Sequence, residues 1–322
     1  MVWLHLHPRR QTVVNPLLGI GLKVLSALSF TLMSAGIKIV STEFPTGELV
    51  FFRSAFALVP LLLWLGWRGE LIDAVRTKNI LGHARRGVIG STGMFCGFFA
   101  LSFLPLPDAI SIGYTAPLIV VILAALVLKE TVRVYRWTAV AVGFVGVLIM
   151  LAPHFQSSVL VNGFGDGAAI GAVFALVGAC CAAGATVEVR RLISTEKTGA
   201  VVFYFSMLTT LLGLSTIVLG WNAPTFTEFC ILVGIGILGG LGQILLTQSY
   251  RYADASLVAP FEYTTMIWAI LIGWFVFGEL PVPAVIAGSS IVMGSGLFVI
   301  WREHRLGLER RRANAAAPPR AT

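Results

Sequence analysis

Residues Ser41–Ser54 read STEFPTGELVFFRS, and Ser194–Ser206 repeat that pattern as STEKTGAVVFYFS. Both stretches have the Ser-Thr-Glu start, the Thr-Gly step, an aromatic pair and a closing serine. A second pattern also recurs in each half of the chain, where a Tyr-Thr pair precedes a glutamate by the same interval. The pairs are Tyr114-Thr115 before Glu130 and Tyr263-Thr264 before Glu279. Self-similarity over half a chain indicates a duplicated unit. We therefore expect one structural unit to occur twice.

The composition places the chain in a lipid bilayer. Of the 322 residues, 57% are hydrophobic and 12% are charged, and the mean hydropathy is +0.88. Soluble globular proteins carry roughly 25% charged residues. The net charge of +8 does not indicate nucleic-acid binding, because the basic residues fall between apolar runs and form no recognition motif.

Ten apolar segments are long enough to cross a bilayer, which takes roughly 20 residues each. In the first half they are Leu17–Val40, Gly47–Gly66, Gly87–Leu106, Asp108–Leu128 and Val134–Ala152. In the second half they are Gly165–Glu188, Gly199–Gly220, Phe229–Tyr250, Ala255–Phe277 and Val282–Trp301. The sequence thus predicts an all-α integral membrane protein with ten transmembrane helices.

Lysine and arginine alternate between the loops and predict the orientation. Loop 67–86 and the loops that follow every second segment are basic, whereas Pro153–Phe164, Trp221–Glu228 and Phe277–Pro281 contain no Lys or Arg. Cytoplasmic loops carry such an excess of positive charge. We expect a multi-pass protein of the inner (plasma) membrane with both termini in the cytoplasm.

Each copy has five segments, an odd number, so the second copy enters the membrane from the opposite side. The predicted domains are a cytoplasmic N-terminal tail (1–16), two inverted five-helix repeats (17–152 and 165–301) and a basic cytoplasmic tail (302–322), disordered after Gly307. Inverted repeats recur in secondary transporters, where two equivalent halves rock around a central site. The sequence thus predicts a carrier working by alternating access.

Glu262 is the foremost candidate for the substrate or ion pathway. It follows Pro260 and lies about two turns into the ninth segment, roughly 10 Å along the helix. Ionisable residues inside a membrane segment are costly and mark function by default. A hydrogen bond that packs helices near the headgroups is an equally weighted interpretation. Glu262→Gln separates the two through the transport rate and its pH dependence.

Arg53 is the next candidate, two turns into the second segment, with Glu48 before it and Lys38 at the end of the first segment. Its counterpart in the second copy is Phe205, so the repeat itself does not require this charge. Snorkelling or pairing with Glu48 is favoured over substrate contact.

Neutral polar residues within the segments complete the candidate pathway: Tyr114, Thr115, Tyr263, Thr264, Gln243, Gln248 and Trp268. Pro117 frees a backbone carbonyl near the first Tyr-Thr pair. Glu130 and Glu279 end their helices and are expected to have structural roles there. The glycines of the third and eighth segments are assigned to close helix packing, with sliding or bending during transport as the alternative.

Three stretches carry a family resemblance: Lys38 with Pro45, Glu48 and Phe51-Phe52-Arg53; Ala100–Glu130; and Ala253–Pro281. They resemble the drug/metabolite transporter superfamily, as two EamA-type repeats. Lys129 stands where that family usually has glycine. The resemblance implies ten helices around a cavity lined chiefly by the first, third, fourth, sixth, eighth and ninth spans. It also implies ion- or exchange-driven transport of a small molecule without ATP. A proton or another cation is the expected coupling ion, and no cofactor is predicted.

Within that superfamily, the sequence looks most similar to the branch with S-adenosylmethionine and riboflavin uptake carriers. Uptake of a cofactor-like or amino-acid-derived solute is therefore predicted. The alternative is an efflux carrier for amino acids or other metabolites.

An intramembrane enzyme is a remote alternative. Gly163–Asp166 spells the GxGD of intramembrane aspartyl proteases, but no second aspartate can face Asp166 at the midplane. All five histidines are expected in loops or tails, and the four cysteines form no CxxC pair, so no metal site and no enzyme activity are predicted. A non-transporting membrane scaffold is the remaining alternative.

Overall fold

The computed structural model describes residues 16–127, 133–159, 167–193, 195–253 and 258–316. The first half contains α1 (Pro16–Val40), α2 (Thr46–Trp67), α3 (Leu71–Val75), α4 (Ile80–Leu101), α5 (Leu106–Gly113), α6 (Thr115–Val127) and α7 (Val134–Val159). The second half contains α8 (Gly167–Ile193), α9 (Thr198–Ser215), η2 (Thr216–Leu219), α10 (Phe226–Tyr252), η3 (Ala259–Tyr263), α12 (Thr264–Ile272), η4 (Gly273–Phe277) and α13 (Pro283–Ala316). All the assigned elements of these residues are helical, as predicted.

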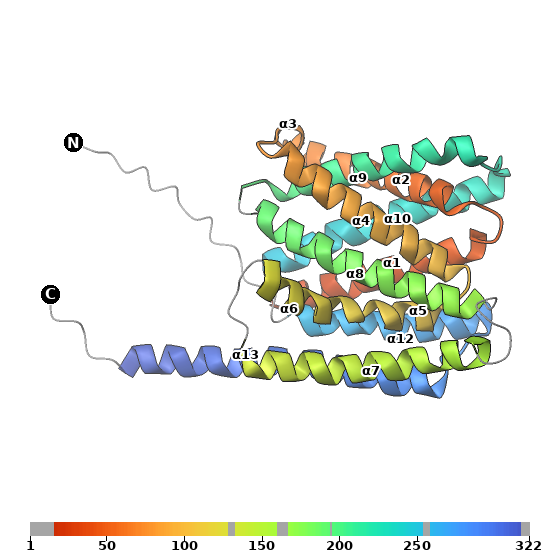
Figure 1. The fold of residues 1–322 in the computed structure, drawn as a ribbon. Coiled ribbons are helices and arrows are strands. Elements are labelled where there is room, and N and C mark those ends of the chain that lie inside the picture. Colours follow the sequence, from red (N-terminus) through yellow and green to blue (C-terminus); the bar gives the residue numbers. More distant parts are fainter. Residues whose placement is uncertain (1–15, 128–132, 160–166, 194, 254–257, 317–322) are drawn as a thin grey trace, which may run out of the picture.

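The long helices run side by side along one direction, as a bilayer requires (Figure 1). Within the described ranges, eight helices are long and apolar enough to cross a membrane. Large apolar side chains also cover the outside of the bundle: Leu63, Leu148, Val218 and Phe275 are mostly exposed. In a bilayer, lipid would cover these side chains, whereas in water they would form large apolar patches.

Two predicted spans are interrupted rather than continuous. The described part of the segment predicted at Asp108–Leu128 is divided at Tyr114 into α5 and α6. In the segment predicted at Ala255–Phe277, residues 259–277 form η3, α12 and the π-helical turn η4. Pro117 accounts for the first break, because it removes the backbone donor that would bond to Gly113. Gly278 ends η4 with φ of 66°, a left-handed conformation that suits glycine.

The predicted start of the third span was wrong. It was placed at Gly87, but α4 begins at Ile80, where the Asn79 side chain accepts a hydrogen bond from Gly82 N and caps the helix. His83 and Arg86 therefore belong to the helix. The prediction that all five histidines lie in loops or tails is also wrong, since His83 and His154 are buried in α4 and α7.

The predicted disorder after Gly307 differs from the structure as well. Helix α13 continues to Ala316 and extends beyond the other helices (Figure 1). The run of Arg, Glu, Ala and Leu that follows the apolar part of α13 consists of good helix formers, so a helix already nucleated by its packed part continues at little cost.

Glycines set how closely the helices pack. A Cβ built on Gly236 or Gly240 of α10 would lie 2.8 Å from the backbone oxygen of Phe52 or Ala57 in α2, so these two helices touch backbone to backbone. Gly146 of α7 and Gly288 of α13 make a similar contact. The packing interpretation of the glycine-rich eighth segment agrees with these contacts.

Candidate functional site

A cavity of about 1090 Å³ opens into the bundle between α2, α4, α8, α9 and α10. At one end it reaches the interhelical loops that carry Arg68, Glu70, Glu196 and Lys197. We call this end of the molecule the basic end. Drug-sized and metabolite-sized ligands occupy pockets of ~300–1,000 Å³, so the cavity is large enough for one.

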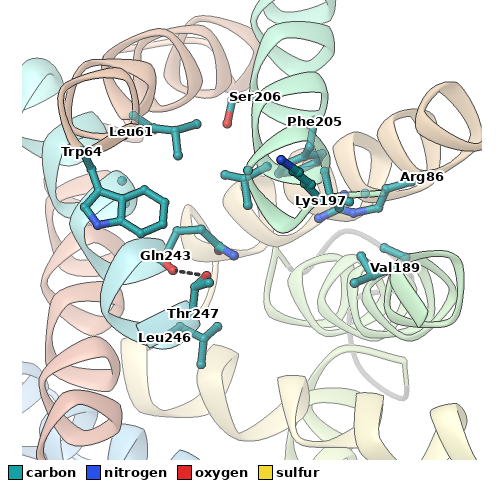
Figure 2. A pocket seen from close by; sticks show the side chains of 18 of the residues that line it. Leu61, Trp64, Arg86, Val189, Lys197, Phe205, Ser206, Gln243, Leu246 and Thr247 are labelled. Atoms are coloured by element: carbon teal, nitrogen blue, oxygen red, sulfur yellow. Dashed lines mark hydrogen bonds between the residues drawn. The ribbon is translucent and has the colours of Figure 1, made fainter. Parts of the chain in front are cut away.

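The cavity wall is mainly apolar, with a few neutral polar groups. Leu61 and Trp64 of α2 face Gln243, Leu246 and Thr247 of α10 across the open space (Figure 2). The Thr247 hydroxyl donates to the Gln243 carbonyl oxygen of its own helix at 2.8 Å. Gln243, Thr247 and Gln248 are the neutral polar residues with which α10 lines the cavity.

Charged residues occupy two levels of the cavity. At the rim, Arg68 pairs with Glu70 at 2.9 Å, and Glu196 accepts hydrogen bonds from Thr77 Oγ1 at 3.0 Å and Lys78 N at 2.8 Å. These rim carboxylates are thus already occupied by local partners.

Arg53 and Arg86 are the charges away from the rim. Arg53, on α2, is only 7% exposed, and its Nε has no hydrogen-bond partner. Arg86, on α4, has buried Nε and Nη1 atoms that are also without a partner. Its guanidinium carbon lies 3.7 Å from the centroid of the Phe205 ring, a cation–π contact. Both arginines line the same cavity, so it contains two like charges away from its rim.

Three of the predicted pathway residues line this cavity: Arg53, Gln243 and Gln248. The pairing expected between Arg53 and Glu48 is not formed. The buried Glu48 carboxylate instead accepts a hydrogen bond from Asn222 N at 3.1 Å, at the opposite end of the bundle from Arg68.

Glu262 lies elsewhere. Its carboxylate forms an ion pair with Lys23 of α1, which is buried, while half of the Glu262 side chain remains exposed. Neither residue lines the cavity described above. The role of Glu262 in the substrate path stays a prediction, and Lys23 is the partner that sequence reasoning missed.

Lys38 and Glu279 meet at the end of the bundle opposite the basic end. Lys38 Nζ lies 3.0 Å from Glu279 Oε1 and donates to the Leu104 carbonyl at 2.6 Å. Glu279 Oε2 accepts from Leu106 N at 3.1 Å. The two side chains thus join α1, the start of α5 and the end of η4. We call this group of contacts the outer latch, where "outer" means only the end of the bundle opposite the basic end. Glu130, predicted as the corresponding helix end, lies outside the described residues.

The two Tyr-Thr pairs meet between the halves. The rings of Tyr114 and Tyr263 pack edge to face with centroids 5.3 Å apart, and Tyr114 hydrogen-bonds to Thr265. Thr115, directly after Tyr114, is fully buried. Trp268 lies on α12, and Thr264 donates to the Phe261 carbonyl at 2.6 Å. Among these, no residue lines the cavity.

The helices that form the cavity also differ from the expected set. The third, sixth and eighth spans contribute, as α4, α8 and α10, but α2 and α9 take part where the first, fourth and ninth spans were expected. Helix α1 instead packs tightly on α10, where Ser26 and Ser29 donate to the Gly242 and Leu238 carbonyls, both at 2.8 Å.

Arg86 is the main residue that the sequence interpretation missed. It was counted as a loop residue because it follows Arg85 and precedes an apolar run. The Asn79 cap was the signal that would have moved the helix start and placed Arg86 within the helix.

The comparison with known families decides the identity. The model of the EamA-like transporter family matches twice, over residues 17–152 and 169–301. The chain belongs to the EamA-like transporter family. The resemblance inferred from the sequence is therefore confirmed, and the protein is a membrane transporter by family.

Several curated relatives cover most of the chain. The pseudopaline exporter CntI of Pseudomonas aeruginosa is 31% identical over 85% of this chain and 93% of its own length. An S-adenosylmethionine uptake transporter of Rickettsia bellii is 27% identical over 89% of this chain and 95% of its own. A riboflavin transporter of Vibrio cholerae is 28% identical over 92% and 97%.

One solved protein structure has the same fold, with a TM-score of 0.61 over 88% of this chain and 98% of the other. At 18% sequence identity, this likeness shows the fold alone.

Proposed function

We propose that this protein is a secondary carrier that moves a small organic metabolite across a bacterial inner membrane by alternating access. The observation that carries the proposal is the large cavity, which reaches the loops at the basic end while the outer latch joins helices at the other end. A carrier caught open to one side has this form.

The proposed architecture is ten spans in two inverted five-helix repeats, 17–152 and 165–301, between an N-terminal tail (1–16) and a basic tail (302–322). The family model matches two ranges of similar length. Each proposed repeat also has its fourth helix interrupted at a Tyr-Thr pair, and the two tyrosines are in contact. Equivalent residues that meet support a two-fold relation between the halves.

The proposed orientation puts the basic end in the cytoplasm, because membrane proteins concentrate Lys and Arg there. The cavity described here is then the inward-open state. An importer releases its solute from this state and an exporter loads from it.

The proposed substrate is a cofactor-like or amino-acid-derived solute. Uptake is the direction that the sequence predicts, and the relative named as an S-adenosylmethionine uptake transporter supports it. The relative named as a riboflavin transporter supports a cofactor-like solute. Efflux is the second candidate, and the relative named as a pseudopaline exporter supports it. Transport is proposed to be coupled to a proton or another cation, or to exchange, with no enzymatic step.

Counterflow of labelled solutes into proteoliposomes tests the proposal. The panel contains riboflavin, S-adenosylmethionine, amino acids and purines, each measured with and without an imposed pH gradient. Thr247→Trp fills the cavity and should abolish counterflow. Leu241→Trp, on the exposed face of the same helix, should leave it intact. Equal rates in the two variants, or no counterflow of any solute, would overturn the proposal.

A further inference from the structure

We propose that the cavity binds an organic anion and that Arg53 and Arg86 hold its carboxylate or another oxyanion group. This inference rests on the proposed function and specifies the chemical class of its substrate. Nothing in the family match or in the names of the relatives assigns these two residues.

The first argument is the cost of the two charges. Arginine stays protonated in proteins, so burial cannot remove its charge. Burying an ion costs several kcal/mol unless a partner compensates it. Among the described residues, no carboxylate forms an ion pair with Arg53 or Arg86, and three of their nitrogens lack any hydrogen-bond partner. A substrate anion would supply the partner that the protein does not.

The second argument is that neighbouring residues hold both guanidinium groups in place. Phe205 packs against Arg86 from α9. A Cβ at Gly90 would lie 2.2 Å from Arg86 Nη1, and a Cβ at Gly239 would lie 3.1 Å from Arg53 Nε. Because glycine has no Cβ, each guanidinium group can occupy the space beside it. Such support from neighbours orients a binding group before the ligand arrives.

The third argument is the charge balance of the whole cavity. Its lining contains four basic residues, Arg53, Arg68, Arg86 and Lys197, but only two acidic ones, Glu70 and Glu196. Both acidic residues are at the rim and have local partners. The net positive lining would attract anions from solution and repel cations. The apolar wall formed by Leu61, Trp64 and Phe205 would cover the uncharged part of the solute.

Arginine also matches the geometry of the proposed ligand. Its planar guanidinium presents a fixed set of donors that bind carboxylate or phosphate through two parallel hydrogen bonds. An anion in the cavity that both arginines line would be attracted by each of the two positive charges. Neutral solutes would gain nothing from either charge.

The first experiment measures thermal stabilisation of the purified protein by acetate and by inorganic phosphate, with chloride at equal ionic strength as the reference. Both anions fit a cavity of this size whatever its shape. A ligand that binds the folded state raises the melting temperature by mass action. We expect a concentration-dependent rise for the oxyanions over chloride. The same melting temperature in all three salts would overturn the proposal.

The second experiment compares an anionic solute with a neutral counterpart in two pairs: N-acetyltryptophan with its amide, and riboflavin 5′-phosphate with riboflavin. The acid or phosphate should bind at least tenfold more tightly than its neutral counterpart, and the two pairs distinguish carboxylate from phosphate. Equal affinities within both pairs would contradict the proposal. This comparison uses the wild-type protein and does not depend on any variant's folding.

Arg53→Gln and Arg86→Gln should each reduce the affinity for the oxyanion at least tenfold. Arg53→Lys keeps the positive charge but loses the paired donors of the guanidinium group. Its oxyanion affinity should therefore lie between that of the glutamine variants and that of the wild type. Full oxyanion affinity in both glutamine variants would also overturn the proposal. Counterflow distinguishes failure of the anion site from failure of the carrier function. Transport of neutral solutes only would contradict the anion site and leave the carrier function standing. Anion binding without transport of any solute would contradict the carrier function and leave the anion site standing.

Discussion

Tyr114 and Tyr263 contact each other edge to face, with their ring centroids 5.3 Å apart, and each stands where a long apolar segment is interrupted. Helix α6 begins directly after Tyr114, and α12 begins directly after Tyr263. The two halves of the chain therefore meet through equivalent residues at equivalent irregularities.

We predict that this contact is energetically coupled. Edge-to-face aromatic pairs contribute about 0.5–1.5 kcal/mol beyond the burial of their area. Tyr114→Leu, Tyr263→Leu and the double variant form a cycle, read out by denaturant unfolding in detergent. A coupling free energy in that range is expected, and additive effects would show that the contact is incidental.

Gly90→Ala should weaken oxyanion binding about tenfold with little change in thermal stability. The new Cβ would collide with Arg86 Nη1 and with the edge of the Phe205 ring at 2.9 Å. Both are ends of side chains, so the Arg86–Phe205 contact would be displaced rather than the helix. Isothermal titration measures the affinity. Gly97→Ala is the matched control on the same helix, because nothing lies within 4 Å of its Cβ. Equal affinities in the two variants would contradict the assignment of Arg86.

The outer latch should control opening to the other side of the membrane. Glu279→Gln removes the ion pair with Lys38 and should raise the population of the outward-open state about fivefold, as a loss of ~1 kcal/mol implies.

A single cysteine at Ser206, in a variant without the native cysteines, reports that population through its labelling rate from the outer side. Arg68→Gln breaks an ion pair at the basic end and is the control, with no increase expected. Unchanged labelling in Glu279→Gln would exclude a latch role.

Glu196 should stabilise the loops at the cavity rim in a pH-dependent way. Although partial burial acts to raise its pKa, hydrogen bonds from Lys78 N and Thr77 prevail, so the pKa lies below 4.5. A depressed pKa means that the stabilisation is complete above the unfolded value and is lost as the pH falls through the folded one.

The wild type should therefore melt above Glu196→Gln at neutral pH, by the equivalent of about 1–3 kcal/mol. The difference should shrink as the pH falls below about 4.5. Thermal unfolding across this range measures it. A difference that is independent of pH would mean that the charge of Glu196 is not involved.

Gly288→Ala should destabilise the contact between α7 and α13. Its Cβ would lie 2.4 Å from the Gly146 carbonyl oxygen, a backbone atom that cannot move aside alone. Overpacking of this kind costs about 1–3 kcal/mol. Gly294→Ala, on the same helix with nothing within 4 Å, should be neutral or slightly stabilising. Melting temperatures of the two variants decide the point.

The sequence by itself determined the membrane location, the helical class, the internal repeat and the family. These properties follow from composition and from the length of apolar segments, which are local along the chain. Tyr114 and Tyr263 could be paired from the sequence for the same reason, because a repeat is visible without knowing any contact. The start of α4 was predicted too late because the charged pair Arg85 and Arg86 is typical of a loop.

Only the tertiary structure decided which charges share a cavity and which are neutralised. Glu262 and Arg53 looked alike in sequence, as single charges in apolar segments, yet Glu262 meets Lys23 and Arg53 has no ion-pair partner among the described residues. Partners depend on how each helix is rotated about its axis and how closely its neighbours approach. Contacts such as those of Gly239 and Gly90 determine both the rotation of a helix and its distance from its neighbours. Because such contacts join residues far apart in the chain, no local sequence pattern predicts them.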